Sequence, residues 1–207
     1  MSVNIKYKNN SIAELPDTGT KTLKTAGKYC EDDITVEYAK PAGGGSGATE
    51  PYVEEVYNNN NLISATLHGH KSIRDYGFYR SGNLTSINFP IGLTRIGNYA
   101  FSFCHELSLT SLPSGITSLG NDAFRYCEKL NITRLPSSLK YIYNTAFEVC
   151  KGLTSITFEG TPTSISSSAF KGCTNLTIIN VPWAEGAVAG APWGATNATI
   201  NYNYTGA

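Results

Sequence analysis

Apolar residues recur along this chain at a fixed spacing of 23 residues. The pattern Ala-Phe-x-x-Cys-x-x-Leu occurs four times, beginning at Ala100, Ala123, Ala146 and Ala169, and a weaker copy surrounds Phe78. The expected core columns are Phe78, Phe101, Phe124, Phe147 and Phe170, and Cys104, Cys127, Cys150 and Cys173. A third column contains Ile73, Ile96, Leu119, Ile142 and Ile165. Such self-similarity predicts a repeat protein, because no single unit can bury its own apolar face.

The residues between these columns predict the shape of each repeat. Residues 84–89 end in apolar–polar alternation, which is typical of a short half-buried strand, and Pro90 ends that strand because it has no N–H to donate. The Ala100-Phe101 pair is expected to begin a short helical turn with Phe101 and Cys104 facing the core. We therefore expect a β-rich solenoid, a leucine-rich repeat coil with short strands and short helical turns, preceded by a small β-strand N-terminal segment.

Two copies depart from the common phase. In residues 107–112 and 130–135 one apolar residue lies one place earlier than in the other copies, so strict alternation fails. We expect a local bulge or an altered strand start in these two copies. The exact exposed positions stay open at this point.

The repeat resembles a known family. The segments Leu-Thr-Ser-Ile-x-Phe-Pro and Leu-Thr-x-Ile-Gly-x-x-Ala-Phe-x-x-Cys resemble the BspA-like leucine-rich repeat family of bacteria over residues 62–182. The resemblance implies a curved solenoid and a binding role, since characterised members include surface adhesins that bind proteins. It identifies no ligand and no contact residue.

The two ends differ from the repeat. Residues 41–50 are rich in Gly and Ser and read as a linker, which separates a small β attachment or oligomerisation segment (residues 1–40) from the solenoid (residues 51–182). So short a segment is expected to pair with another chain, another copy or the solenoid. Residues 183–207 are expected to cap the open last coil with Trp183 and Trp193. Aromatic binding of a sugar is the alternative role for these tryptophans.

Two short terminal segments carry a second resemblance. Residues 19–29 with 33–36, and residues 181–186 with 191–200, resemble segments of tail-associated proteins of phages and prophages from gut bacteria. This resemblance implies a virion setting, in which residues 1–40 would contact other virion proteins. A homo-oligomer is expected in that setting.

Charge narrows the range of partners. Sixteen basic and sixteen acidic residues give zero net charge, and charged residues make up only 15% of the chain, against about 25% in an average domain. We therefore expect no nucleic-acid partner and no membrane partner. No apolar run approaches the roughly 20 residues of a membrane span, and the first residues lack the apolar core of a secretory signal. The expected location is a phage tail or the extracellular surface.

Candidate chemistry is sparse. A 23-residue spacing is not a zinc spacing, so the four laddered cysteines are interpreted as buried thiols, with disulfides between neighbouring coils as the alternative. Cys30 stands outside the ladder, and His68 with His70 could hold a metal only with a third ligand. No nucleophile–base set appears in a recognisable context, so no catalytic residue, metal ligand or cofactor is expected.

Seven aromatic residues lie at variable positions of the repeat and form the predicted ligand-contact surface: Tyr76, Tyr79, Tyr99, Phe103, Tyr126, Tyr141 and Tyr143. The alternative is that several of them only cover neighbouring coils. The predicted function is non-enzymatic recognition of a surface protein or glycan, as a receptor-binding protein of a phage or prophage tail. A bacterial cell-surface adhesin and, less favoured, a glycan or cell-wall hydrolase are the alternatives.

Overall fold

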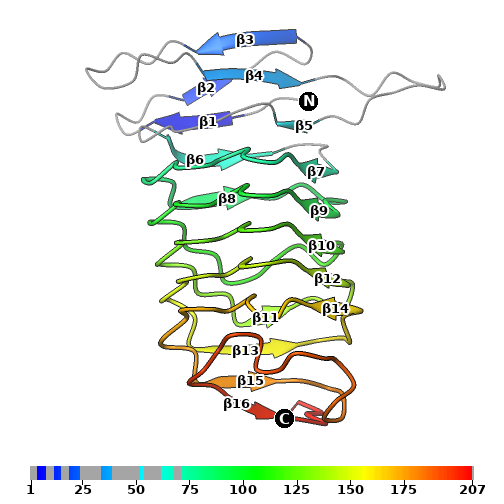
Figure 1. Ribbon diagram of the computed structural model, residues 1–207. Helices are drawn as coiled ribbons and strands as arrows, with labels where there is room; N and C mark the ends of the chain where they lie inside the picture. Colours follow the sequence, from blue (N-terminus) through cyan, green and yellow to red (C-terminus); the bar gives the residue numbers. More distant parts are fainter. Residues whose placement is uncertain are drawn as a thin grey trace, which may run out of the picture.

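The fold is a stack of coils that runs from the N-terminal strands to the C-terminus (Figure 1). This computed structural model describes residues 71–206, Leu67 and, before them, the strands β1 (Asn4–Tyr7), β2 (Ile12–Glu14), β3 (Gly19–Leu23), β4 (Ile34–Tyr38), β5 (Tyr52–Val53) and β6 (Leu62–Thr66). The predicted linker, Cys30, His68 and His70 lie outside the described residues.

A six-stranded parallel sheet forms one side of the stack. Its strands, in spatial order, are β5, β7 (Ser72–Ile73), β9 (Arg95–Ile96), β10 (Ser118–Leu119), β12 (Tyr141–Ile142) and β14 (Ser164–Ile165). Ile73 pairs with Ile96, and Ile96 with Leu119, so the apolar column predicted from the sequence is the register of this sheet. Residues that lie 23 apart in the sequence are therefore direct neighbours in adjacent coils.

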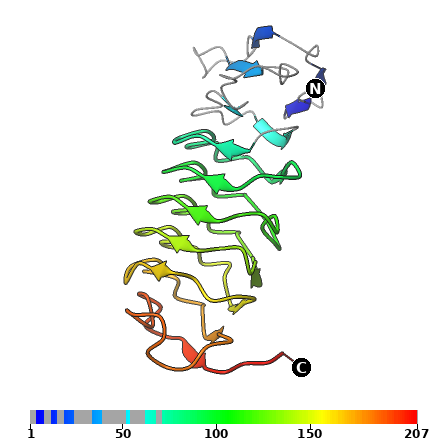
Figure 2. The same cartoon turned by 90° about the vertical axis from the view of Figure 1, so that its right-hand side faces the viewer.

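The other side of the stack carries two separate sheets instead of one. In the first, β6 pairs with β8 (Ser86–Asn88). In the second, β11 (Arg134–Leu135), β13 (Ser155–Phe158), β15 (Ile178–Asn180) and β16 (Thr199–Asn201) follow in parallel order. Figure 2, turned by 90°, shows the coils in succession down the stack.

The N-terminal strands continue the first of these sheets. β1 pairs antiparallel with β2 and with β6, while β3 and β4 pair with each other. The edge of β6 that faces away from β8 is thus covered by β1. Residues 1–40 are expected to pair with another chain, with another copy or with the solenoid. In the structure, β1 pairs with the solenoid strand β6.

Stacked aromatic rings fill the centre of the coils. The phenylalanine column is fully buried, and neighbouring rings are nearly parallel with centroids 5.1–5.6 Å apart, at Phe78, Phe101, Phe124, Phe147 and Phe170. Offset stacking at this distance adds to the burial of large apolar surface. The cysteine column lies beside the rings, and Cys104, Cys127, Cys150 and Cys173 are buried free thiols.

The corners that follow the six-stranded sheet are tight turns, which corrects the expectation of short helical turns. Within residues 71–206 no helix forms. The N–H groups of Tyr99, Phe101 and Phe103 donate to carbonyls of the next coil, at Asn121, Ala123 and Arg125. These N–H groups are therefore unavailable for the bond to the carbonyl four residues earlier that a helix requires. No helix in the described part of the chain is long and apolar enough to cross a bilayer.

The last coil closes the core with tryptophan. Trp193 lies 23 residues after Phe170, is fully buried, and donates its Nε1 hydrogen to the Ala189 carbonyl at 2.8 Å. Trp183 packs edge-on against Phe158, with ring centroids 5.2 Å apart. Because both indoles are buried, neither presents a ring on which a sugar could stack, and their packing is that of a cap.

Candidate binding surfaces

Five of the seven predicted contact residues form one continuous aromatic cluster. Tyr76 stacks on Tyr99 at 4.9 Å, and Phe103 stacks on Tyr126 at 4.9 Å. Tyr79 joins the two pairs by edge-to-face contacts with Tyr99 at 6.4 Å and with Phe103 at 5.9 Å. We call these five residues the aromatic cluster. Tyr76 is exposed, and the other four are half-buried.

Two arginines border the aromatic cluster, and they differ in whether a carboxylate lies beside the guanidinium. The Arg80 guanidinium lies 5.2 Å from the Tyr79 ring centroid and 5.6 Å from that of Phe103. Arg125 lies over Tyr126 at 5.2 Å, and its Nε is 2.6 Å from Oε2 of Glu148. Arg80 has no ion-pair partner among the described residues. Its charge is therefore held in place by rings and remains available to an outside group.

An acidic residue beside the aromatic cluster adds a local negative charge. The Asp122 carboxylate, together with a smaller effect of burial, raises the pKa of Tyr99. Asp122 also lies 3.5 Å from Nη1 of Arg125. The tyrosine hydroxyl therefore stays protonated and able to donate a hydrogen bond.

The backbone beneath the aromatic cluster is strained. Two columns of residues other than glycine have φ between 52° and 64°, namely Tyr76, Tyr99, Asp122 and Thr145, and Arg80, Phe103, Tyr126 and Val149. The next member of the second column is Gly172, which adopts this conformation without strain. Because Asp122, Thr145 and Val149 adopt the same conformation in later coils, the positive φ belongs to the turn of the repeat.

The remaining two predicted contact residues lie elsewhere. Tyr141 and Tyr143 form their own ring pair at 6.2 Å, and neither makes a ring contact with the aromatic cluster in the described part of the chain. Both are exposed. They constitute a second, smaller patch on β12 and just after it.

The laddered thiols have no feature of a reactive site. Cys104, Cys127 and Cys150 each donate to the carbonyl of a phenylalanine 26 residues earlier, at 3.0 Å. Burial, partly offset by a backbone hydrogen bond, raises the pKa of Cys104 and Cys127, and burial does the same for Cys150. A protonated buried thiol is a poor nucleophile and a poor metal ligand. Residues 71–206 contain no group of three or more residues suited to hold a metal ion.

A second ladder, made of polar side chains, was not predicted. The Asp75 carboxylate accepts from the Asn98 N–H at 2.7 Å, and the Asn98 side chain accepts from the Asn121 N–H at 2.8 Å. Asn121 in turn accepts from the N–H of Asn144 at 3.2 Å. The same 23-residue spacing in the sequence could have identified this column, which satisfies the backbone donors at the turns.

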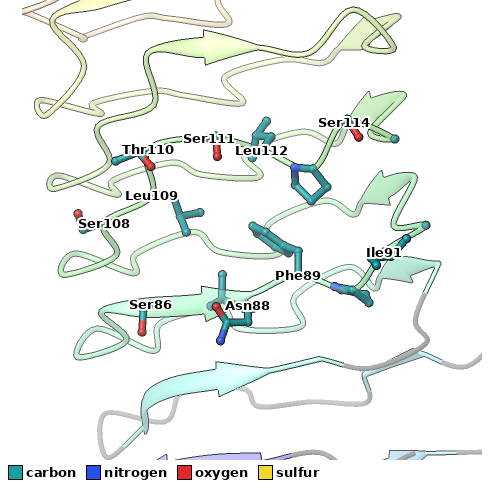
Figure 3. A pocket seen from close by; sticks show the side chains of 15 residues that line it. Ser86, Asn88, Phe89, Ile91, Ser108, Leu109, Thr110, Ser111, Leu112 and Ser114 are labelled. Atoms are coloured by element: carbon teal, nitrogen blue, oxygen red, sulfur yellow. The ribbon is translucent and has the colours of Figure 1, made fainter.

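A groove lies on the second side of the stack, between the sheet that ends at β8 and the sheet that begins at β11. It has a volume of about 570 Å³ and lies between residues 86–92 and residues 108–115. Figure 3 shows Phe89 and Leu109 in the space between the strand with Ser86 and Asn88 and the coil with Thr110 and Ser111. None of the lining residues is charged. This groove coincides with the first of the two copies that depart from the common phase.

Comparison with known proteins agrees with the geometry. A family model described as "BspA type Leucine rich repeat region (6 copies)" matches residues 71–185. None of the curated proteins matches the chain.

Two solved structures share the fold. A leucine-rich repeat protein of T. pallidum (TpLRR) has a TM-score of 0.55 and 27% identity, over 63% of this chain and 64% of its own. A leucine-rich repeat protein from Bacteroides ovatus ATCC 8483 has a TM-score of 0.51 and 22% identity, over 74% of this chain and 47% of its own. This chain thus spans less than two thirds of the length of either protein.

Proposed function

Since the chain belongs to the BspA-type leucine-rich repeat family, we propose that it is a non-enzymatic recognition protein that binds a surface protein or glycan through the aromatic cluster. The observation that carries this proposal is the contiguous set of Tyr76, Tyr79, Tyr99, Phe103 and Tyr126, bordered by Arg80, which has no ion-pair partner in the described part of the chain. Tyrosine and arginine are the residues most enriched at binding hot spots. Rigid rings also lose little conformational entropy on binding.

The packing within the aromatic cluster favours a contact surface over simple cover for the core. The phenylalanine column already fills the interior with stacked rings. The aromatic cluster forms a second layer that reaches solvent, and all of its members except Tyr79 have positive φ. Neither the apolar core nor the repeat register requires aromatic residues there, because Thr145 and Val149 occupy the same columns in a later coil.

The test uses an array of cell-surface glycans and purified surface proteins probed with the full chain. We expect Tyr79→Ala and Arg80→Gln each to lower the affinity for a captured partner by about thirtyfold, since hot-spot truncations cost about 2 kcal/mol or more of binding free energy. Tyr141→Ala, in the separate exposed patch, is the matched control and should bind as the parent does. Unchanged affinity in the first two variants, with melting temperatures near that of the parent, would show that the aromatic cluster is not the contact surface.

Two settings are compatible with this activity. A phage or prophage tail is supported by the terminal segments that resemble tail-associated proteins, with residues 1–40 as the attachment or oligomerisation segment. A bacterial cell surface is supported by family membership. In the tail setting, light scattering should show that the full chain is an oligomer, and purified phage particles should contain it. Deletion of residues 1–40 should then abolish both the oligomer and the incorporation into particles. A monomer that is absent from particles and accessible to protease on intact cells indicates the adhesin.

A further inference from the structure

The groove on the second side of the stack coincides with a break in the hydrogen-bond ladder. A register of one repeat would place Ile87 opposite Thr110, as Ile156 lies opposite Ile179 further along the stack. Yet β8 pairs with β6 alone, and no backbone hydrogen bond joins residues 86–90 to residues 109–112 in the part of the chain that the structure describes. On either side of this gap backbone hydrogen bonds still join the two coils, among them Ser108 N–H to Thr85 O at 3.0 Å and Thr117 N–H to Thr94 O at 2.8 Å.

The cause of the break is the shifted phase of the sequence. In residues 84–89 the inward apolar residues are Leu84, Ile87 and Phe89, whereas in residues 107–112 they are Leu107, Leu109 and Leu112. A change of phase between neighbouring strands interrupts their ladder locally, because a one-residue shift turns each backbone group to the other side. The next coil has the same shifted phase and is joined to residues 109–110 by two backbone hydrogen bonds. The phase changes back between residues 130–135 and residues 153–158, but there β11 and β13 continue the ladder, with Arg134 opposite Thr157. At the groove no such pairing follows between residues 86–90 and residues 109–112 of the described chain.

Backbone groups with the chemistry of a strand edge face this gap. Leu67 N–H donates to the Asn88 carbonyl at 3.0 Å, so Asn88 points its backbone toward β6. Alternate residues of a strand point to opposite neighbours, so the N–H and C=O of Ile87 point into the gap. Across the gap, the N–H groups of Leu109 and Thr110 have no acceptor among the described residues. The donor and the acceptor of Ile87 on one rim match the backbone of an extended peptide.

The groove walls limit the side chains that could enter it. Phe89, Leu109 and Leu112 supply apolar surface, the rim carries serine and threonine hydroxyls, and Ile91 is fully exposed beside it. With no charged residue in the lining, a charged ligand would lose hydration without gaining a partner. The rim from Ser86 to Pro90 is about 13 Å long at ~3.3 Å per residue, which suits a segment of about four residues.

We propose that the groove binds a short, extended, uncharged peptide segment of a partner protein, which pairs with the free edge at Ile87. This mode is β-augmentation, in which main-chain hydrogen bonds supply affinity and apolar pockets select alternate side chains. The site is separate from the aromatic cluster, so the two can be tested independently.

The experiment selects a displayed heptapeptide library on the full chain. A phase-restored variant carries Leu109→Ser, Thr110→Ile, Ile132→Thr and Thr133→Ile, which give both shifted coils the phase of residues 84–89 and close the ladder. A matched control changes the same four positions without changing the phase, by Leu109→Ile, Thr110→Ser, Ile132→Leu and Thr133→Ser. We expect uncharged peptides that bind the parent and the control and bind the phase-restored variant at least about tenfold more weakly.

A second measurement keeps the proposal testable if the phase-restored variant does not fold. N-methylation of alternate residues in a selected peptide should weaken binding to the parent at least about tenfold, and peptide binding should slow hydrogen exchange at Ile87. Tyr79→Ala should leave peptide binding unchanged, which separates this site from the aromatic cluster. No enrichment, enrichment of charged peptides, or equal binding of N-methylated peptides would overturn the proposal.

Discussion

At the residue scale, the same residue type has different roles in neighbouring positions of the cap. Trp193 and Trp183 are both buried, but only Trp193 has a partner for its indole N–H, the Ala189 carbonyl. The Trp183 Nε1 has no partner among the described residues. A buried donor without an acceptor costs free energy, so its removal relieves a penalty, whereas loss of a satisfied bond creates one.

This difference predicts unequal effects of the same substitution. Trp193→Phe should lower the free energy of unfolding by ~1–3 kcal/mol more than Trp183→Phe, because it leaves the Ala189 carbonyl unpaired. Urea unfolding of the two single variants measures the difference. Equal losses would mean that the hydrogen bond of Trp193 contributes little to the cap.

The thiol column predicts a dependence of stability on pH. Burial raises the pKa of Cys104, Cys127 and Cys150 in the folded chain, above the ordinary thiol value of about 8.5. The unfolded chain therefore releases protons first as the pH rises, and the stabilisation present below pH ~8.5 is lost above it. Between pH 7.5 and 9.5 the loss should reach about 1 kcal/mol per thiol.

Urea unfolding under reducing conditions at the two pH values tests this linkage. Cys127→Ala should show a smaller loss between them than the parent. In a Cys30→Ser background, the four core thiols should resist iodoacetamide in the folded chain and react after unfolding. Rapid alkylation of the folded chain would contradict the burial of the column.

At the element scale, the stacked rings couple each coil to the next. Phe124 is fully buried, with Phe101 and Phe147 at 5.2 and 5.6 Å on its two sides. Phe124→Ala should lower the free energy of unfolding by ~3–5 kcal/mol. Ile91→Ala, at a fully exposed position, is the control and should be near neutral. A near-neutral Phe124→Ala would show that this ring is not a core contact.

Sequence periodicity predicts the elements that depend on burial, and fails for those that depend on hydrogen bonds between coils. The columns through Phe101 and Ile96 predict the solenoid, and the shifted copy at residues 107–112 predicts an irregular strand there. The turn conformation at Tyr99 is not predictable in this way, because its N–H bonds to Asn121 in another coil. The groove likewise requires two coils of different phase to be neighbours, which becomes visible only when the coils are stacked.

At the scale of the whole molecule, the chain is a one-dimensional stack whose two ends are protected differently. At the start, β1 pairs antiparallel with β6, and at the other end β16 pairs parallel with β15 below the tryptophan cap. Each coil contacts only its neighbours, so stability is a sum of coil and interface contributions. Disruption of one end is therefore expected to lower the stability of the adjacent coil more than that of distant coils.

Two variants that damage opposite ends test this behaviour by hydrogen exchange. Deletion of residues 1–40 removes the strand that pairs with β6, and should raise exchange mainly at residues 72–88. Thr199→Pro removes the N–H with which β16 donates to the Thr177 carbonyl at 2.8 Å, and should raise exchange mainly at residues 176–181. Exchange at Phe124, in the middle of the stack, should change least in both variants. A uniform rise along the whole stack in either variant would mean that the coils unfold as a single cooperative unit, because nearest-neighbour coupling alone decays with distance from the damaged end.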